Sequence, residues 1–238
     1  MRVAISGVSG RMGSLIAKTI SESTDIELVA AFDPVGVGEE IYGVKISDPA
    51  DMDRILSEKN PDILIDFTNP DACVENVKIA VKNGVNLIIG TTGLSEEQKM
   101  EIEREVKEKV VAVISPNFSI GVNIFWKLVR NAGEMLEDFD VEIVETHHRQ
   151  KKDAPSGTAV LTGDILKSVG KEVTFHSIRA GDIVGDHTVL FAGIGERIEI
   201  THRAHSRMAF VSGVIRAIRW IKGVKKGIYS MDDVIGAF

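Results

Sequence analysis

The chain has 238 residues, of which 44% are hydrophobic and 26% are charged, a balance that is ordinary for a folded globular protein and excludes disordered and fibrous classes. Its formal net charge of −7 argues against a nucleic-acid partner. The single cysteine, Cys73, excludes an intramolecular disulfide, and its helical surroundings favour a buried structural residue.

Met1 leads directly into an apolar strand, without the charged and apolar regions of a signal peptide. No apolar run approaches the ~18 residues that are needed to span a bilayer. We therefore expect a cytoplasmic protein with no membrane partner.

The first half of the chain alternates short apolar strands with amphipathic helices. Ser95 and Gln98 form a capping box that begins one of the helices. Repeated strand–helix–strand units of this length predict an α/β fold of Rossmann type, a doubly wound parallel sheet with helices on both faces. Strands are predicted at 2–6, 27–32, 62–67, 86–89 and 110–115, and helices after the turn at 7–13, at about 70–83 and at 95–109.

The pattern changes beyond Pro116, where strands cluster around two helices and predict a second, α+β domain. We expect a dinucleotide-binding domain at 1–118, with 205–238 returning to it, and the second domain at 119–204. The predicted elements are helices at 121–136, 156–169 and 207–221 and strands at 141–146, 173–179, 187–192 and 197–202.

Three glycines, Gly7, Gly10 and Gly13, separate the first strand from the first helix. A glycine-rich turn in this place is typical of dinucleotide sites, where backbone N–H groups and the helix dipole hold a pyrophosphate. Ser9 stands where the common fingerprint has its second glycine, so the turn alone is a weak signal. Asp33 strengthens it, because it follows Gly13 by twenty residues, at the end of the second strand. The alternative is a tight turn in an α/β protein that binds no nucleotide.

The choice of cofactor is left open by two residues. Asp33 favours NAD, whereas Arg11 is placed to reach the 2′-phosphate of NADP, so we expect both NADH and NADPH to be used. Two further loops, Gly90-Thr91-Thr92-Gly93 and Ser115-Pro116-Asn117-Phe118, follow strands at the edge where open α/β sheets bind ligands. The alternative for each loop is ordinary turn chemistry, with Asn117 only capping a helix.

The segment 145–159 places several cations immediately before a helix that begins after Pro155. Free N–H groups at the helix start, Gly157 and the hydroxyl of Thr158 suit a small dicarboxylate. His147, His148 and Lys151 are the titratable groups beside it, and neighbouring cations favour release of the Lys151 proton. The alternative is a strand that ends in a solvated basic loop.

These motifs occur together with Asn-Phe-Ser, with Glu-Thr-His-His-Arg-x-Lys-x-Asp-Ala-Pro-Ser-Gly-Thr-Ala and with Arg-x-Gly-Asp-Ile-Val-Gly-Asp-His. Over essentially the whole chain, the combination resembles the 4-hydroxy-tetrahydrodipicolinate reductase (dihydrodipicolinate reductase) family. The resemblance implies reduction of a cyclic dicarboxylate to tetrahydrodipicolinate with NADH or NADPH, in the diaminopimelate route to lysine. It also implies a homotetramer built through the sheet of the second domain.

The resemblance implies a role for each matching residue. His147 is the expected proton donor or acceptor and Lys151 the proton donor, while substrate carboxylates are expected at His148, Gly157 and Thr158. One departure is Pro34, which stands where some members carry an arginine that helps to select NADP. The residues expected to line the cofactor are Gly7, Val8, Ser9, Gly10, Arg11, Met12, Asp33, Gly90, Thr91, Thr92, Ser115, Pro116, Asn117 and Phe118.

The sequence also allows alternative functions, which we compare with that of a reductase. A regulatory protein that binds NAD without chemistry would not need the cationic segment, and a serine hydrolase using Ser156 would lack the Gly-x-Ser-x-Gly elbow. A metal site on His147, His148 and His187 would need a further ligand, and we expect no metal. A dehydrogenase for another small anionic amino acid is the closest enzymatic alternative. Since a strand points successive side chains to opposite faces, His147 and His148 can both face a ligand only if the strand has ended there.

Overall fold

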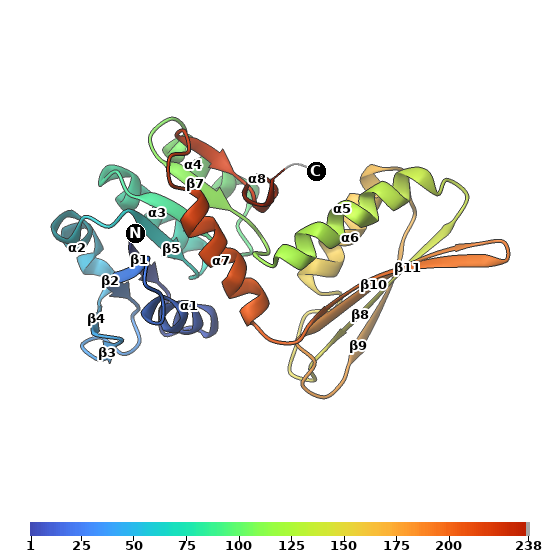
Figure 1. The fold of residues 1–238 in the computed structure, drawn as a ribbon, viewed down its shortest axis with the longest axis horizontal. Helices are drawn as coiled ribbons and strands as arrows, with labels where there is room; N and C mark the ends of the chain where they lie inside the picture. Colours follow the sequence, from blue (N-terminus) through green and yellow to red (C-terminus); the bar gives the residue numbers. More distant parts are fainter. Residues whose placement is uncertain (237–238) are drawn as a thin grey trace. The chain divides into compact units, whose positions relative to one another are not determined.

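The structure, a computed structural model, describes residues 1–236. It divides into two compact units, one made of residues 1–118 with the C-terminal segment from Phe210, and one made of Ser119–Ala209 (Figure 1). Within the described residues, no helix is long and apolar enough to cross a membrane.

The first unit contains an eight-stranded sheet in the order β12-β7-β6-β5-β1-β2-β4-β3. Its neighbouring strands pair in parallel, except for the antiparallel pair β3 and β4, so the predicted doubly wound sheet is confirmed. The strand order reverses at β1, which lies between β2 and β5, and ligands of such sheets bind at the carboxyl ends beside this reversal. The strands are β1 (Arg2–Ser6), β2 (Glu27–Phe32), β3 (Glu40–Ile41), β4 (Val44–Ser47), β5 (Ile63–Asp66), β6 (Asn86–Ile89), β7 (Val111–Ile114) and β12 (Gly227–Tyr229).

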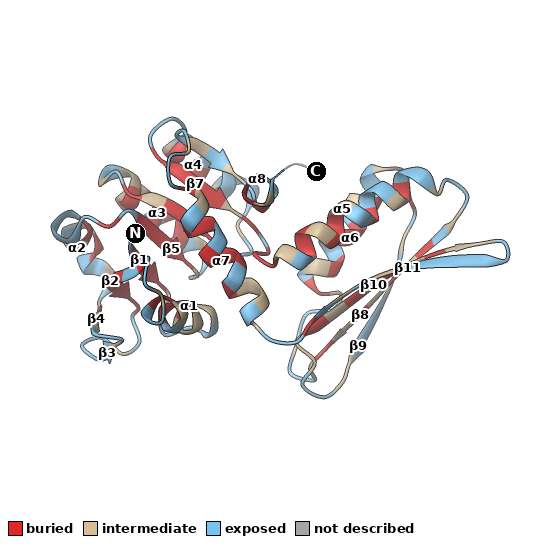
Figure 2. Ribbon diagram, in the orientation of Figure 1, coloured by how far each residue is buried: buried red, intermediate tan, exposed pale blue. Residues whose placement is uncertain are grey.

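Helices cover both faces of this sheet. On one face, alternate residues of the strands form a buried cluster with the apolar sides of α2, α3 and α4, and Cys73 lies in this cluster as predicted. The other face is covered by α1 and α7, whose apolar stripes are buried (Figures 1 and 2). The helices are α1 (Arg11–Ser21), the 3₁₀ helix η1 (Pro49–Asp51), α2 (Met52–Lys59), α3 (Pro70–Lys82), α4 (Glu96–Val106), α7 (Met208–Trp220) and α8 (Met231–Ile235).

The second unit is a four-stranded sheet, in the order β11-β10-β8-β9, with two helices on one face. Inward residues such as Ile143 and Phe191 pack against Phe125 of α5 and Leu166 of α6. The indole N–H of Trp126 in α5 donates to the hydroxyl of Thr162 in α6, at 3.0 Å. The elements are α5 (Ile120–Met135), β8 (Asp140–His147), α6 (Gly157–Ser168), β9 (Thr174–Arg179), β10 (Gly185–Gly193) and β11 (Glu196–Ala204).

The structure corrects some of the predicted boundaries. The capping box of Ser95 and Gln98 is present, but α4 ends at Val106 because Lys107 leaves the helical region and Glu108 has a φ of 60°. The strand predicted at 187–192 begins two residues earlier, at Gly185, because pairing with Ala204 extends it. The short elements β3, β4, η1, α2, α8 and β12 were not predicted, since two to eight residues carry too little hydrophobic periodicity.

Candidate functional site

The glycine-rich turn of the first unit is closely packed. Gly7 has a φ of 81°, and a Cβ atom there would clash with the carbonyl oxygen of Phe67. A Cβ atom on Gly13 would clash with the carbonyl oxygen of Gly7. Gly10 is the N-cap of α1 and provides no side-chain hydrogen bond, so the first N–H groups of this helix have no side-chain cap. The turn therefore combines tight packing with an anion-binding helix start.

Asp33 fixes the turn to the loop that follows β2. Its carboxylate is buried and accepts hydrogen bonds from the backbone N–H of Ser9 at 3.0 Å and of Val35 at 2.9 Å. The Ser9 hydroxyl donates to the carbonyl of Val35 at 2.9 Å. The sequence indicated only a contact between Asp33 and the cofactor, and the structure adds this internal role. Each carboxylate oxygen can still accept a further bond.

A cavity of about 290 Å³ opens beside the turn. It lies at the carboxyl ends of β1, β2 and β5, next to the reversal of strand order. Not every residue of the turn presents a side chain to solvent, because Val8 is fully buried whereas Arg11 is exposed. Val8 can therefore meet a ligand only through its backbone. The lining includes Gly7, Gly10, Asp33, Pro34, Phe67 and Asn69.

A buried carboxylate that sequence reasoning missed, Asp66, organises the loops around this cavity. It accepts hydrogen bonds from Asn76 Nδ2 at 2.7 Å, from the Thr91 hydroxyl at 2.6 Å and from the Thr68 hydroxyl at 2.8 Å. Asn76 also donates to the Ser6 hydroxyl at 3.0 Å, so the ends of β1, β5 and β6 share one network. No local motif marks Asp66, since its partners lie up to 25 residues away in sequence.

The two predicted loops differ in what they offer a ligand. In the first, Thr91 is buried and committed to Asp66, Thr92 is exposed, and Gly90 has no room for a side chain because the ring of Phe67 fills that space. In the second, the Ser115 hydroxyl donates to the carbonyl of Asn117 at 2.8 Å.

The second loop also leads into α5. Phe118 is buried, with its ring 5.8 Å from that of Phe67. Pro116 is exposed. Asn117 does not cap α5, since Ser119 is the N-cap and accepts from the N–H of Val122.

In the second unit, His147 lies at the end of β8, next to the buried carboxylate of Glu145. The Nδ1 atom of His147 hydrogen bonds with Oε2 of Glu145, two residues earlier on the same face of the strand. Oε1 of Glu145 accepts from Arg179 Nη2 at 2.7 Å, and Arg179 is the register partner of His147 on β9. Glu145 and Arg179 were not predicted, because their relation to His147 depends on strand pairing.

Burial and charge set the protonation of this group. Burial lowers the pKa of His147 below its usual range, and the hydrogen bond with Glu145 opposes this without reversing it. Burial alone would raise the pKa of Glu145, but hydrogen bonds from Arg179, Ser177 and His147 hold it below its usual range. At pH 7 the arrangement is therefore a neutral imidazole that donates Nδ1–H to a carboxylate.

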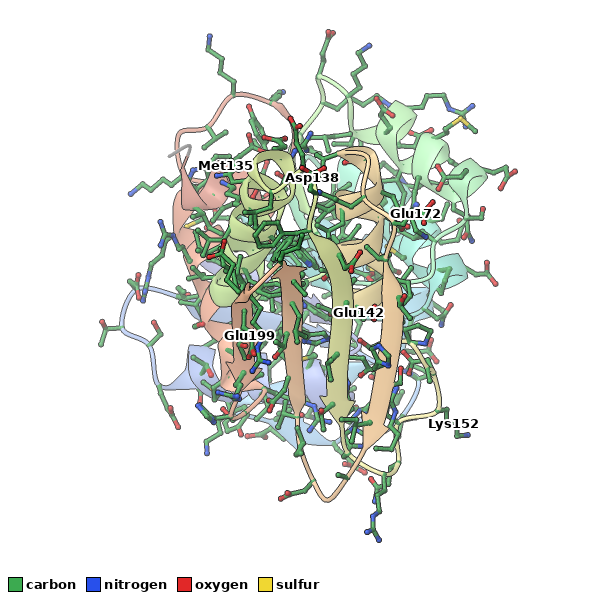
Figure 3. The ribbon with its side chains drawn as sticks, turned by 90° about the vertical axis from the view of Figure 1, so that its right-hand side faces the viewer. Met135, Asp138, Glu142, Lys152, Glu172 and Glu199 are labelled. Atoms are coloured by element: carbon green, nitrogen blue, oxygen red, sulfur yellow. The ribbon has the colours of Figure 1, made fainter. Side chains whose placement is uncertain are left out.

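The loop that follows β8 holds the remaining predicted cations. β8 ends at His147, so strand alternation no longer dictates the direction of His148. The backbone N–H of His148 donates to the carbonyl of Ile183 at 2.7 Å. Lys151 Nζ pairs with the Asp153 carboxylate at 2.8 Å, whereas Lys152 is exposed and extends away from the sheet (Figure 3).

The helix start predicted after Pro155 is confirmed. Ser156 is the N-cap of α6, and its hydroxyl oxygen accepts from the N–H of Ala159 at 3.2 Å. Gly157 is exposed, and a Cβ atom there would meet nothing within 4 Å. The start of α6 is thus open to a ligand at its backbone.

His187, another residue outside the predicted site, links this helix start to His147. Its Nε2 lies 3.1 Å from the Ser156 hydroxyl, and its ring meets that of His147 edge-on, with centroids 5.2 Å apart. Burial lowers the pKa of His187 to about 3, so the imidazole that hydrogen bonds with the Ser156 hydroxyl is neutral.

The pairing of Ser156 with His187 does not make a hydrolase. His187 Nδ1 is buried and has no hydrogen-bond partner among the described residues, so no acid orients the ring as a catalytic base requires. Ser156 is itself only 1% exposed. Across residues 1–236, no three His, Cys, Asp or Glu side chains are arranged to hold a metal ion.

Comparisons with known proteins cover the whole chain. Residues 1–118 match the family model of the dihydrodipicolinate reductase N-terminus, and residues 121–235 match that of its C-terminus. The chain is 50% identical over 269 residues to the 4-hydroxy-tetrahydrodipicolinate reductase of Methanocaldococcus jannaschii, with 99% of this chain and 97% of that protein covered. It is 49% identical over 261 residues to the protein of the same name from Methanosarcina mazei, with 99% of each covered. Among solved structures, a dipicolinate-bound dihydrodipicolinate reductase from Paenisporosarcina sp. TG-14 has a TM-score of 0.84 at 28% identity, over 98% of both chains.

Proposed function

The chain belongs to the dihydrodipicolinate reductase family, and we propose that it reduces 4-hydroxy-tetrahydrodipicolinate to tetrahydrodipicolinate through the two sites described above. It is an oxidoreductase of the diaminopimelate route to lysine, and it depends on a pyridine nucleotide. The strongest support for the site is the open start of α6, which His187 connects to His147 through contacts with Ser156 and with the imidazole ring.

The glycine-rich turn fits a pyridine nucleotide. Gly7 and Gly13 allow the tight turn, since side chains there would clash with the carbonyl oxygens of Phe67 and Gly7. The uncapped start of α1 provides N–H donors for a pyrophosphate. The cofactor, when bound, supplies the hydride. The other residues proposed to hold it are Val8, Ser9, Gly10, Arg11, Met12, Asp33, Gly90, Thr91, Thr92, Ser115, Pro116, Asn117 and Phe118.

Both NADH and NADPH are proposed as cofactors. Asp33 retains acceptor capacity for ribose hydroxyls after its two backbone bonds, which supports NADH. Arg11 is exposed at the first position of α1, where a guanidinium can meet a 2′-phosphate, which supports NADPH. Pro34 supplies no charge beside Asp33, so Arg11 alone is proposed to discriminate between the two.

The substrate is proposed to bind as a dicarboxylate at the start of α6. Gly157 leaves the backbone N–H groups accessible, and Thr158 adds a hydroxyl on the first turn. His148 is proposed as a further partner of a carboxylate. This set of donors resembles the anion sites found at other helix starts and needs no metal ion.

Two residues are proposed to handle the proton that completes the reduction. Lys151 carries the ammonium group that donates it, and its pairing with Asp153 holds the side chain in the loop beside β8. His147 is neutral, with its proton on Nδ1, so its Nε2 is free to accept a hydrogen bond or a proton. A bound dianion favours the protonated form of His147.

A homotetramer is proposed to form through the uncovered face of the second unit's sheet. This face carries the alternate residues of β8, β9, β10 and β11 that point away from α5 and α6 (Figure 3). Leu190 lies at its centre, between its register partners Glu142 and Glu199. Its half-buried apolar residues Val144, Leu190 and Ala192 lie among polar side chains, a mixture that is suited to an interface between two copies of the chain.

The decisive experiment is oxidation of NADH and of NADPH with freshly generated 4-hydroxy-tetrahydrodipicolinate. Wild type is compared with Lys151→Ala and His147→Ala, with Lys152→Ala as the matched control because Lys152 is an exposed neighbour. A positioned proton donor contributes roughly 10²–10⁴ in rate, so each of the first two variants should lose that much while the control keeps its turnover. Near-wild-type turnover in both variants would remove them from the catalytic role. A folded wild type that binds NADH but oxidises neither cofactor would reject the reaction.

A further inference from the structure

Arg179 contacts the surroundings of both residues that are proposed to handle protons. One nitrogen, Nη2, donates to Glu145 Oε1 at 2.7 Å and to the carbonyl oxygen of Asp153 at 2.6 Å. The other terminal nitrogen, Nη1, donates to the carbonyl of Ile178 at 2.8 Å, which anchors the guanidinium to its own strand. Glu145 in turn hydrogen bonds with His147, and the carboxylate of Asp153 pairs with Lys151.

We propose that Arg179 and Glu145 are the positioning residues of this site. Through Glu145, Arg179 fixes the orientation and tautomer of the His147 ring. Through the carbonyl of Asp153, the same guanidinium holds the loop that carries Lys151. The inference deepens the proposed function, on which it rests for the roles of His147 and Lys151.

The burial of Glu145 makes this pairing obligatory. Its side chain is fully buried, and a buried carboxylate without partners is strongly unfavourable. Each of its oxygens has a cationic or N–H partner, Oε1 with Arg179 and Oε2 with His147. Because Arg179 can only donate, Glu145 must accept from it, which leaves the second oxygen to accept from Nδ1–H of His147. The network therefore permits one tautomer of the imidazole.

The loop between β8 and α6 is held in place by hydrogen bonds to the end of β9 and to the loop that follows β9. The backbone N–H of His148 donates to the carbonyl of Ile183 at 2.7 Å, and that of Arg149 donates to the carbonyl of Gly181 at 3.2 Å. These hydrogen bonds join the loop after β8 to the loop after β9. Arg179 is the last residue of β9. Its hydrogen bond to the carbonyl of Asp153 holds the other end of the 148–153 segment. The charged and titratable groups around His147 are Glu145 on β8, Arg179 on β9, His187 on β10 and Lys151 in the loop.

The first test is Glu145→Gln, which preserves shape but changes what the residue can accept. The amide oxygen of the substituted side chain must turn to Arg179, so its NH₂ group faces His147 and forces the imidazole proton onto Nε2. We expect the ¹⁵N chemical shifts of the His147 ring in the free protein to change from the Nδ1–H to the Nε2–H pattern. We expect turnover to fall by at least 10²-fold, with the affinity for NADH unchanged.

The second test is Arg179→Lys, with Arg130→Gln as the control. A lysine keeps the charge, but its single nitrogen cannot make the two bonds of Nη2 and also the bond of Nη1 to Ile178 that anchors the guanidinium to its strand. We expect faster hydrogen–deuterium exchange in the 148–153 segment and at least a tenfold loss of turnover. Arg130 makes only an exposed pair with Glu134 on α5, so its substitution should change neither quantity.

The outcomes separate the two proposals. A Nδ1–H tautomer that survives in Glu145→Gln, or wild-type exchange and turnover in Arg179→Lys, would overturn the positioning roles. A wild type without reductase activity would reject the proposed function, while the tautomer and exchange measurements would still decide this inference. Should Glu145→Gln fail to fold, Arg179→Lys tests the same network with its charge retained.

Discussion

A Cβ atom on Gly185 would lie 2.9 Å from Nε2 of His147. Gly185 is the first residue of β10 and has no positive φ, so the absence of a side chain there is required by the imidazole and not by the backbone. The position of His147 thus depends on Glu145 at Nδ1 and on the space beside Gly185 at Nε2.

We expect Gly185→Ala to displace the His147 ring and to lower turnover by at least tenfold. Gly193→Ala is the control, because on the same strand it crowds the ring of Phe139 instead of His147. Both variants should lose some stability, since each introduces an overlap into a packed region. The steady-state rate per folded molecule should be lower for Gly185→Ala than for Gly193→Ala. Equal rates in the two variants would contradict the steric role of Gly185.

Gly157→Ala should act on substrate binding and leave the fold intact. A Cβ atom there meets nothing within 4 Å in the free protein, and alanine at the first position of a helix is not strained. A carboxylate that approaches the backbone of α6 would be obstructed by the added methyl group. We expect KM for the substrate to rise at least fivefold with KM for NADH unchanged, and an unaltered substrate KM would place the carboxylate elsewhere.

Stability should decrease as the pH falls below about 6.5, the ordinary pKa of histidine. Burial lowers the pKa of His187 to about 3 in the folded protein, so between these values the unfolded chain binds a proton that the folded chain does not. This single group contributes a slope of at most ~1.4 kcal/mol per pH unit. His147 and His202, whose pKa values burial also lowers, add in the same direction. Denaturant unfolding across pH 4–8 measures the slope, and His187→Gln should reduce it; an identical slope would show that His187 is not buried in neutral form.

Arg11→Ala should reduce the efficiency with NADPH more than that with NADH. Only NADPH carries the 2′-phosphate that an exposed guanidinium at the start of α1 can meet. We expect the ratio of kcat/KM for NADPH to that for NADH to fall by about tenfold, as for the loss of one charged hydrogen bond of ~1.4 kcal/mol or more. A ratio that does not change would exclude Arg11 as the discriminating residue.

Leu190→Arg should reduce the mass of the assembly in solution. It places a charge at the centre of the uncovered sheet face, between Glu142 and Glu199, where a second sheet would have to bury it. Leu128→Arg is the matched control, since Leu128 is exposed on α5 at the other side of this unit. Light scattering should give a tetramer for wild type and for the control and a smaller species for Leu190→Arg. A monomeric wild type would reject the tetramer.

The sequence by itself determined the features that depend on neighbours along the chain. Hydrophobic periodicity predicted the alternating elements of the parallel sheet, and the capping box at Ser95 marked a helix start because a cap bonds within three residues. Glycine spacing located the turn at 7–13, and the motif around His147 indicated the family. The assignment of single residues to substrate and cofactor remains a prediction.

Only the tertiary structure decided which side chains meet across strands. Arg179 reaches Glu145 across 34 residues, and Asn76 reaches Ser6 across 70. Such contacts depend on strand register, and a shift of one residue would turn each side chain to the opposite face. Glu145, Arg179 and His187 lie in motifs that indicate the family, but these motifs do not show that the three side chains meet, and Asp66 lies in no such motif. Their contacts form because a hydrogen-bond partner offsets the cost of burying a polar side chain, and the fold determines which partner is in reach.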